Sequence, residues 1–445
     1  MKRVVSVIGI CLVWASGAAA QSSSQLTLDE TIAIAMANNR TLQNATLSEE
    51  RAEREIAIAR SRRLPSFSLE TQASRLLRPV DITFPKGAFG DFPSTGPVPN
   101  EDAVITTPAR VTMFMNASVS QPLTQLFQAN LNVRLNEAGL DFERERTRSL
   151  RLSVVNGVKR AYYALLQTSS AVEAAQANAR LLRELDRVVG NRVTQQVALK
   201  ADGLEVQTRL AQVEVTLLTL RNSLSSGKEQ LNRLLGRDVR TPFEVAGVPE
   251  PTRAELDVDA AVARALASRP DVREARVRVQ QAELSRRIAR ADYIPEVGLA
   301  LQSYSPVNID GAPGNITSVG IQLKWEPFDW GRKSQAVAAK ALQVRQAGNA
   351  LSDAEDDVII DIHAQFRKLE EARAKLRVAA LSQQTAEENA RVRVARYQTQ
   401  AALLSDVLQS QASYADAINQ YQQSLLSLLT ATADFEQALG EDVTK

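Results

Sequence analysis

The sequence of 445 residues contains an internal repeat, which limits the folds that the chain can adopt. Residues 26–70 match residues 256–300 at an offset of 230, and the ends of the two halves match at an offset of 204. A duplicated unit is expected to fold as two copies of one arrangement. We therefore predict a first structural repeat at 21–240, a linker at 241–255 and a second structural repeat at 256–445. Matching residues include Leu26 and Leu256, Asp29 and Asp259, Glu53 and Glu283, Pro65 and Pro295, Asp202 and Asp406, and Gly236 and Gly440.

The first twenty residues have the anatomy of a secretory signal peptide. Lys2 and Arg3 precede an apolar run from residue 4 to residue 14, and small residues follow at 17–20. This pattern predicts a signal peptide at 1–20 that is removed from the mature protein. Cleavage would remove Cys11, the only cysteine, so no disulfide is expected. The alternative, that Cys11 carries a lipid, is disfavoured because the bulky Ile10 precedes it.

Composition excludes several classes of protein. The formal net charge is only +2, which gives no electrostatic reason to expect a nucleic-acid partner. After residue 20, no apolar run approaches the 18 or so residues of a membrane-spanning helix. Only 5% of the residues are aromatic, whereas Ala, Gln, Ser, Leu and Arg abound. This mixture favours long helices that pack through small side chains.

The positions of proline outline those helices, because proline disrupts a helix interior. No proline occurs in residues 26–64, 123–241 or 328–445. Apolar residues in the last two stretches recur mostly at spacings of three, four and seven, which is typical of helices. We expect helices at about 40–63, 126–190 and 202–235, with Gly236 as a C-terminal stop. The second half is expected to repeat this order.

Between the helices the apolar period changes to two, which indicates β-strands. The expected strands lie at about 66–75 and 110–120 in the first half, and at about 296–304 and 316–325 in the second. We expect one hairpin in each half and no other strands. The connection at 76–110 is long and rich in Pro and Gly, whereas the connection in the second half is short.

Strands of this length and alternation suit a transmembrane β-barrel, although a half-buried soluble sheet has the same pattern. The long helices and the predicted secretion favour the membrane. Four strands cannot close a barrel, and lipid does not tolerate unpaired strand edges. Several copies are therefore expected to assemble, giving eight, twelve or sixteen strands.

Three motifs resemble those of a known family. The motif Trp325-Glu326-Pro327-Phe328-Asp329-Trp330-Gly331-Arg332 lies at the predicted return from strand to helix, residues 119–123 occupy the matching place in the first half, and residues 28–39 form an Ala-rich entry pattern ending in Asn-Asn. The whole chain after residue 20 resembles the TolC-like outer membrane factors. These are the exit ducts of bacterial efflux pumps and type I secretion systems.

The resemblance implies a fold that is mostly α with a small transmembrane β part. Three copies would form a twelve-stranded barrel in the outer membrane and a twelve-helix barrel across the periplasm. The implied partners are outer membrane lipid, a periplasmic adaptor (membrane fusion) protein and an inner-membrane RND or ABC transporter. Conduction would be passive, with no catalytic residue, metal or cofactor. Small-molecule efflux is favoured over protein secretion.

The resemblance also points to a periplasmic gate near the second turn between helices. Asp406, Tyr397 and Gln409 match positions at or near the family's constriction, and Asp202 is the counterpart of Asp406 in the first half. Gln409 stands where many members have an acidic residue, and both turns lack the glycine common in the family. The alternative for the two aspartates is capping of the returning helices, because Asp accepts hydrogen bonds from free backbone N–H groups.

A different class of protein shares the signal peptide and the long helices. This is the periplasmic coiled-coil adaptor or scaffold, which carries one helical hairpin between compact β domains. The two repeated units of this chain, each around a single strand hairpin, favour the duct.

Overall fold

A computed structural model describes residues 25–75, 77–107, 111–197, 199–248, 257–307, 314–399 and 401–441. The predicted signal peptide lies outside these ranges, as do residues 249–255 of the predicted linker. The chain forms two compact units. Unit 1 takes residues 1–43, 150–267 and 360–445, and unit 2 takes residues 44–149 and 268–359. Each unit draws on both sequence halves, so the compact units differ from the two repeats.

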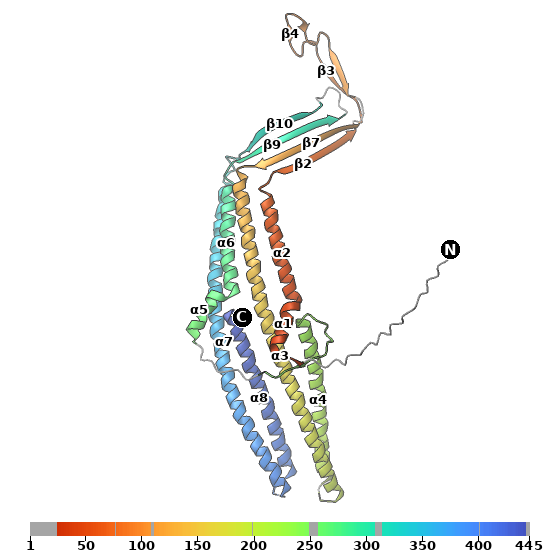
Figure 1. Cartoon of the computed structure of the whole chain (residues 1–445), viewed down its shortest axis with the longest axis vertical. Coiled ribbons are helices and arrows are strands. Elements are labelled where there is room, and N and C mark those ends of the chain that lie inside the picture. Colours follow the sequence, from red (N-terminus) through yellow and green to blue (C-terminus); the bar gives the residue numbers. More distant parts are fainter. Residues whose placement is uncertain are drawn as a thin grey trace, which may run out of the picture. The chain divides into compact units, whose positions relative to one another are not determined.

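Helices make up most of the described chain, and the strands are shorter (Figure 1). The helices are α1 (Leu28–Asn38), α2 (Arg40–Ser61), α3 (Gln125–Thr194), α4 (Lys200–Leu234), α5 (Val258–Ser268), α6 (Pro270–Ala291), α7 (Arg332–Gln398) and α8 (Leu404–Leu439). The strands are β1 (Gln25–Leu26), β2 (Ser66–Arg75), β3 (Val80–Phe84), β4 (Asp91–Phe92), β5 (Gly96–Pro97), β6 (Ala103–Thr107), β7 (Val111–Pro122), β8 (Glu244–Val245), β9 (Glu296–Val307) and β10 (Ile316–Lys324).

Unit 2 contains an antiparallel sheet of four strands in the order β10-β9-β7-β2 (Figure 1). Its strands are the four expected from the alternating pattern. Because directly paired residues point to the same face, the register sorts side chains into rows. One row across all four strands is apolar and its neighbour is polar. The apolar row is Phe67, Val119, Leu301 and Val319, and the polar row is Ser68, Ser118, Gln302 and Ser318.

The helical part of unit 2 consists of most of α2, α3 up to residue 149, α6, and α7 up to residue 359. Its cores are small, as the low aromatic content suggests. One core consists of Leu131, Ala138, Leu284 and Ala291, and another of Ala52, Ile56 and Leu140. Among the helices that the structure describes, none is both long enough and apolar enough to cross a membrane.

The expectation of no further strands was wrong. Within 76–110, β3 pairs with β6 and β4 pairs with β5, both antiparallel. In unit 1, β1 pairs in parallel with β8, which lies in the predicted linker. These strands have two to five residues each, too few to establish a period among frequent Pro and Gly. The pairing partner, not the local pattern, determines them.

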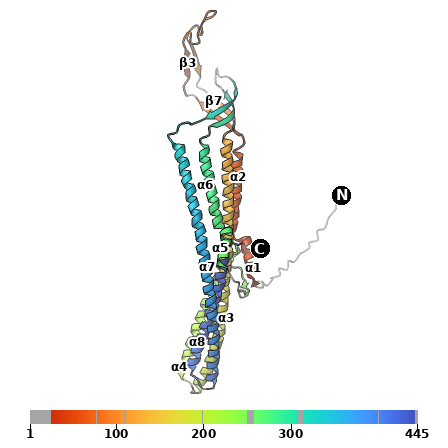
Figure 2. The same cartoon turned by 90° about the vertical axis from the view of Figure 1, so that its left-hand side faces the viewer.

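Unit 1 contains two helical hairpins, α3 with α4 and α7 with α8 (Figure 2). Its core gathers Val154, Val158 and Leu165 of α3 with Leu231 of α4 and Ala433 of α8. The fully buried Tyr162 lies in the same core, and its hydroxyl is within hydrogen-bond distance of the carbonyl oxygens of Leu26 (2.8 Å) and Ala246 (2.7 Å). Tyr162 therefore anchors the segments around β1 and β8 to the long helix.

Glycine ends both returning helices. Gly236 follows the C-cap of α4 with φ +69°, and Gly440 caps α8 with φ +69°. The left-handed conformation favours glycine at these positions. The stop predicted at Gly236 is confirmed.

Candidate functional site

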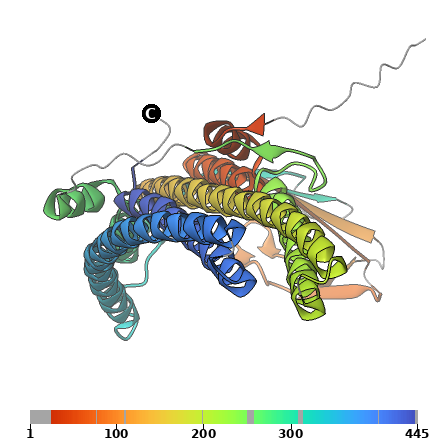
Figure 3. The same cartoon turned by 90° about the horizontal axis from the view of Figure 1, so that it is seen from below.

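The two turns between long helices carry the predicted gate residues, and both belong to unit 1. One turn joins α3 to α4 and the other joins α7 to α8. Figure 3 looks onto both turns from below, with α3 and α4 in yellow and green and α7 and α8 in blue.

Tyr397 lies in the last turn of α7 and contacts the last turn of α3. Arg192 Nη1 donates a hydrogen bond of 2.8 Å to the Tyr397 hydroxyl. The same guanidinium lies 5.0 Å from the centre of the Tyr397 ring, within range of a cation–π contact. Both side chains are partly exposed. This contact ties the first helical hairpin to the second directly beside the turns.

Asp406 lies in the first turn of α8 and faces a cation of α7. Its Oδ2 is 3.9 Å from Arg393 Nη1, and both side chains are about half exposed. Such a pair contributes little to stability, because water screens it. It does leave the Asp406 carboxylate beside a positive charge at the start of the returning helix. No hydrogen bond of a capping kind is found at the N-cap of α8.

Asp202 differs from its counterpart. It lies in the first turn of α4, where its Oδ2 accepts a hydrogen bond of 3.1 Å from the Leu199 backbone N–H. This is the capping role considered for it, performed from the third position of the helix. Gln409 is exposed on α8. Across the described ranges, no hydrogen bond or ion pair joins any two of the four predicted residues.

A cavity of about 290 Å³ lies between the two hairpins of unit 1. All four helices line it, mainly with apolar side chains such as Leu182, Val213 and Leu408. Arg192 and Tyr397 also line it. The Arg192–Tyr397 contact therefore lies beside an incompletely filled gap between the hairpins.

The repeat extends to individual ion pairs near the turns. Glu184 accepts hydrogen bonds from Arg187 on α3, and Glu388 accepts them from Arg391 on α7, at the offset of 204. These hydrogen bonds lower the pKa of Glu184 and of Glu388. The halves diverge six residues further along, where the counterpart of Tyr397 is Val193. Only the second half therefore supplies the phenol of the contact.

The motif at the return from strand to helix belongs to unit 2. Asp329 accepts backbone hydrogen bonds from Gly331 (3.1 Å) and Lys333 (2.8 Å), which caps the start of α7. Gly331 has φ +84°, and the preceding Trp330 also has a positive φ of 56°. The ring of Phe328 lies 4.8 Å from that of Trp330 in an edge arrangement. The motif thus forms a sharp turn that initiates α7.

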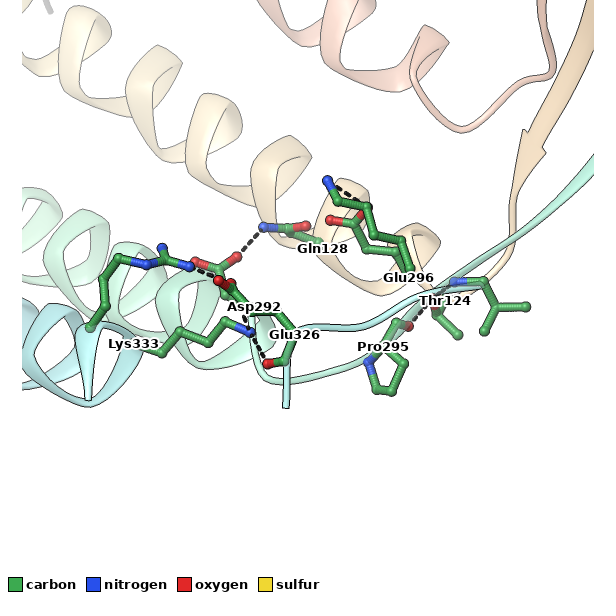
Figure 4. A network of polar contacts seen from close by, with 10 residues as sticks. Thr124, Gln128, Asp292, Pro295, Glu296, Glu326 and Lys333 are labelled. Atoms are coloured by element: carbon green, nitrogen blue, oxygen red, sulfur yellow. Dashed lines mark hydrogen bonds and ion pairs between the residues drawn. The ribbon is translucent and has the colours of Figure 1, made fainter. Parts of the chain in front are cut away.

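A polar network holds the ends of the strands to the starts of the helices in unit 2 (Figure 4). The Thr124 hydroxyl donates to the Pro295 carbonyl (2.6 Å) and accepts from the Val297 N–H (2.8 Å). Gln128 donates to Asp292 at 2.9 Å, joining α3 to the residue after α6. Other residues in the network form ion pairs, Glu326 with Arg332 and Lys333, and Glu296 with Lys324. These contacts fix the junctions of β7 with α3, of α6 with β9 and of β10 with α7.

Sequence reasoning missed the two arginines that contact the predicted gate residues. Arg192 and Arg393 are ordinary basic residues on long helices with many arginines, and they lie 205 and 13 residues from their partners. No local spacing marks either one. Within the described ranges, no three His, Cys, Asp or Glu side chains are placed to hold a metal ion.

Comparison with known proteins establishes the family. The model of a family described as outer membrane efflux protein matches residues 31–237 and 261–441. The chain therefore belongs to the outer membrane efflux protein family, which is a family of channel and transport proteins. This confirms the predicted kinship with the TolC-like outer membrane factors, and it places the chain in the outer membrane, extending into the periplasm.

Relatives and solved structures agree with this assignment. The chain is 23% identical over 361 residues to the alkaline protease secretion protein AprF of Pseudomonas aeruginosa, covering 77% of this chain and 70% of that protein. The fold is similar to the CmeC outer membrane channel of Campylobacter jejuni, with TM-score 0.76, 16% identity and coverage of 93% and 85%. It is also similar to the outer membrane protein VceC of Vibrio cholerae, with TM-score 0.72, 17% identity and coverage of 93% and 96%. At these identities the two structures support the fold alone.

Proposed function

We propose that three copies of this chain form a passive exit duct, with a closed barrel of twelve strands in the outer membrane and a barrel of twelve helices in the periplasm. The observation that carries the proposal is the open sheet β10-β9-β7-β2 with one apolar face. Phe67 and Ile321 on that face are 71% and 74% exposed in the single chain. Apolar side chains of this kind are stable against lipid and unfavourable in water.

The two edges of the sheet require partners in a membrane. β2 and β10 each have a strand on one side only, and unpaired backbone groups are costly in hydrocarbon. Pairing β2 of one copy with β10 of the next satisfies both edges and closes a cylinder. The family resemblance favours three copies over two or four, and cyclic assemblies of identical subunits are common.

The turns of unit 1 would form the periplasmic mouth of this duct. In the closed state, Arg192 holds Tyr397, and Arg393 lies beside Asp406 at the start of α8. Separation of the two hairpins would break the first contact and widen the mouth. Asp202 would stabilise the start of α4 at the mouth by capping this helix. Gln409 would make the constriction less acidic than a carboxylate would.

Opening would require partners on the periplasmic side. We propose a periplasmic adaptor protein that docks at the two turns, together with an inner-membrane RND or ABC transporter that supplies the cargo. Small molecules remain the favoured cargo, although the relative AprF is named for protein secretion. The duct conducts passively, and outer membrane lipid surrounds the barrel.

Two measurements test the proposal. The mass of the detergent-extracted protein should correspond to three chains, and the purified assembly should conduct ions in planar bilayers. Replacement of Arg192 by Gln should increase the open fraction. A monodisperse single chain that stays in solution without detergent would contradict the duct, and it would instead favour the periplasmic scaffold.

A further inference from the structure

We propose that the cavity between the two hairpins of unit 1 binds a small organic anion, a carboxylic or sulfonic acid with one or two rings, and that its occupation holds the mouth closed. The site is built by α3, α4, α7 and α8 together, since all four helices line the cavity. Binding of the ligand does not depend on the assembly of copies. Only the effect of the ligand on opening rests on the proposed duct.

The side chains around the cavity are mostly apolar. Leu182 and Leu408 belong to a buried core cluster, and Leu185 and Val213 pack against that cluster. Leu181 also lines the cavity and is 44% exposed. An apolar body that covers these side chains removes their surface from water, which is favourable. The volume of about 290 Å³ is close to the lower end of small-molecule sites, about 300 Å³, and suits one or two rings.

Two guanidinium groups line the cavity without a carboxylate partner. Arg209 of α4 is exposed, and within the described ranges its side chain forms no hydrogen bond or ion pair. The contacts of the Arg192 guanidinium are with the neutral side chain of Tyr397. A guanidinium binds a carboxylate or sulfonate through strong, charge-assisted hydrogen bonds. An acid that enters the cavity therefore meets positive charge that the surrounding chain does not neutralise.

The acidic side chain at the cavity does not favour a cationic ligand. Among the described residues that line the cavity, Glu184 is the only acidic one. Its carboxylate accepts a hydrogen bond of 3.1 Å from Arg187 Nε, and this bond lowers the pKa of Glu184. Glu184 is thus already paired with a cation that does not line the cavity. The charge that remains for a ligand is positive, which favours an acid over an amine.

The positions of the two cations set the direction of the ligand. Arg183 of α3 and Glu214 of α4 form an ion pair of 2.8 Å, which aligns the two antiparallel helices. Counting along both helices from this pair puts Arg209 about 6 Å further from the turns than Arg192. The acid group therefore binds in the part of the cavity near the turns. The rings extend away from the turns, toward Leu185.

The second half of the sequence lacks this combination of apolar and cationic groups. At the offset of 204, Leu182, Leu185, Arg209 and Val213 correspond to Ala386, Asn389, Ser413 and Ala417. The repeated helical hairpin can therefore be built with small or polar residues at these positions. The apolar and cationic surface belongs to the first hairpin alone, so one site per chain is expected.

An occupied cavity favours the arrangement in which the two hairpins lie close together. Both hairpins line the cavity, so their separation would dismantle the site. A ligand that binds only one of two arrangements shifts the equilibrium toward it. At a ligand concentration about ten times Kd, each site lowers the ratio of open to closed channels about tenfold.

Calorimetric titration tests the binding. The probe is naphthalene-2-carboxylate, and its uncharged isostere naphthalene-2-carboxamide is the control ligand. Both are titrated into the detergent-solubilised mature protein, and the heat from empty micelles is subtracted. We expect one carboxylate per chain, bound at least about tenfold more tightly than the carboxamide, because a guanidinium binds the ionised acid more strongly. Arg209→Gln should weaken carboxylate binding at least about fivefold and leave carboxamide binding unchanged.

Arg221→Gln is the matched control. Arg221 is exposed on the same helix, does not line the cavity and, within the described ranges, forms no hydrogen bond or ion pair. Its replacement should leave both affinities unchanged. Ala412→Leu should prevent binding of both ligands, because Ala412 lines the cavity and the larger side chain fills it.

Three outcomes would overturn the site. These are no binding above that of empty micelles, equal affinity for the two ligands, and carboxylate binding that Arg209→Gln does not weaken. The last of these is decisive even if Ala412→Leu disturbs the packing of the helices, because Arg209 is exposed and its replacement leaves the core intact.

Conductance in planar bilayers separates this inference from the proposed duct. The carboxylate should lower the open fraction of the original channel, whereas the carboxamide at the same concentration should have a much smaller effect. An unchanged open fraction in a channel whose sites are filled would refute the effect on opening. Binding of the probe by a protein that never conducts would support the site and refute the duct.

Discussion

Tyr397→Phe removes only the hydroxyl from the contact that we propose to hold the mouth closed. The hydrogen bond of 2.8 Å from Arg192 is lost, whereas the guanidinium still lies over the ring. A hydrogen bond to a charged group contributes about 1.5 to 3 kcal/mol when shielded, and partial exposure reduces this to about 1 kcal/mol. If three copies open together, the closed state would lose about 3 kcal/mol of stabilisation, which raises the ratio of open to closed channels roughly 100-fold.

Single-channel recording of the purified assembly in planar bilayers measures this ratio. Tyr414→Phe is the matched control, because within the described ranges the Tyr414 hydroxyl makes no hydrogen bond. The control should stay within about twofold of the original channel. If Tyr397→Phe changes the ratio by no more than the control does, the contact with Arg192 does not hold the mouth closed.

Three further substitutions and one control substitution test the fold through denaturation of the detergent-solubilised protein. Gly236→Ala should lower the free energy of unfolding by about 2 to 5 kcal/mol, because φ is +69° and the new Cβ would lie 2.0 Å from the Asn38 carbonyl oxygen. The control is Gly247→Ala, which has open space around it. It should lower the free energy of unfolding by less than about 1 kcal/mol. Asp329→Ala should lower the free energy of unfolding by about 1 kcal/mol, because the cap of α7 is lost. An unchanged midpoint of denaturation would contradict this capping role. Burial raises the pKa of Glu274, so the folded chain binds this proton more tightly than the unfolded chain and gains stability as pH falls through the raised pKa. Glu274→Gln should therefore melt higher than the original chain near neutral pH, and a difference between the two that does not shrink on acidification would contradict this.

Local periodicity accounts for the elements that were predicted well. The alternation around Phe67 and Leu301 led to the strands of the four-stranded sheet, because one face of each strand is mostly apolar. The absence of proline and the heptad spacing led to α3 and α7, whose ends at Thr194 and Gln398 lie within a few residues of the expected turns. Such patterns arise within a single element, so one sequence is enough to find them.

Pairing between distant segments could not be predicted in this way. β1 and β8 have two residues each and lie more than 200 positions apart, and the buried Tyr162 contacts the backbone carbonyl groups of Leu26 and Ala246 beside them. The residues of the candidate site also fall into those that the sequence can identify and those that it cannot. The positions of Tyr397 and Asp406 follow from the resemblance, whereas Arg192 and Arg393 are selected by the packing of helices and have no local signature.

Val193 and Tyr397 occupy matching positions in the two halves, and the difference between them limits the number of contacts that can hold the mouth closed. Six identical units around a mouth could only repeat one interaction at every boundary. Both halves carry an arginine at the matching position, Arg192 and Arg396, but only the second half has a tyrosine directly after it. In a mouth of three such chains, the Arg192–Tyr397 contact would occur at three of the six boundaries between hairpins. A docking partner would need to break the contact only at these alternate boundaries to widen the exit.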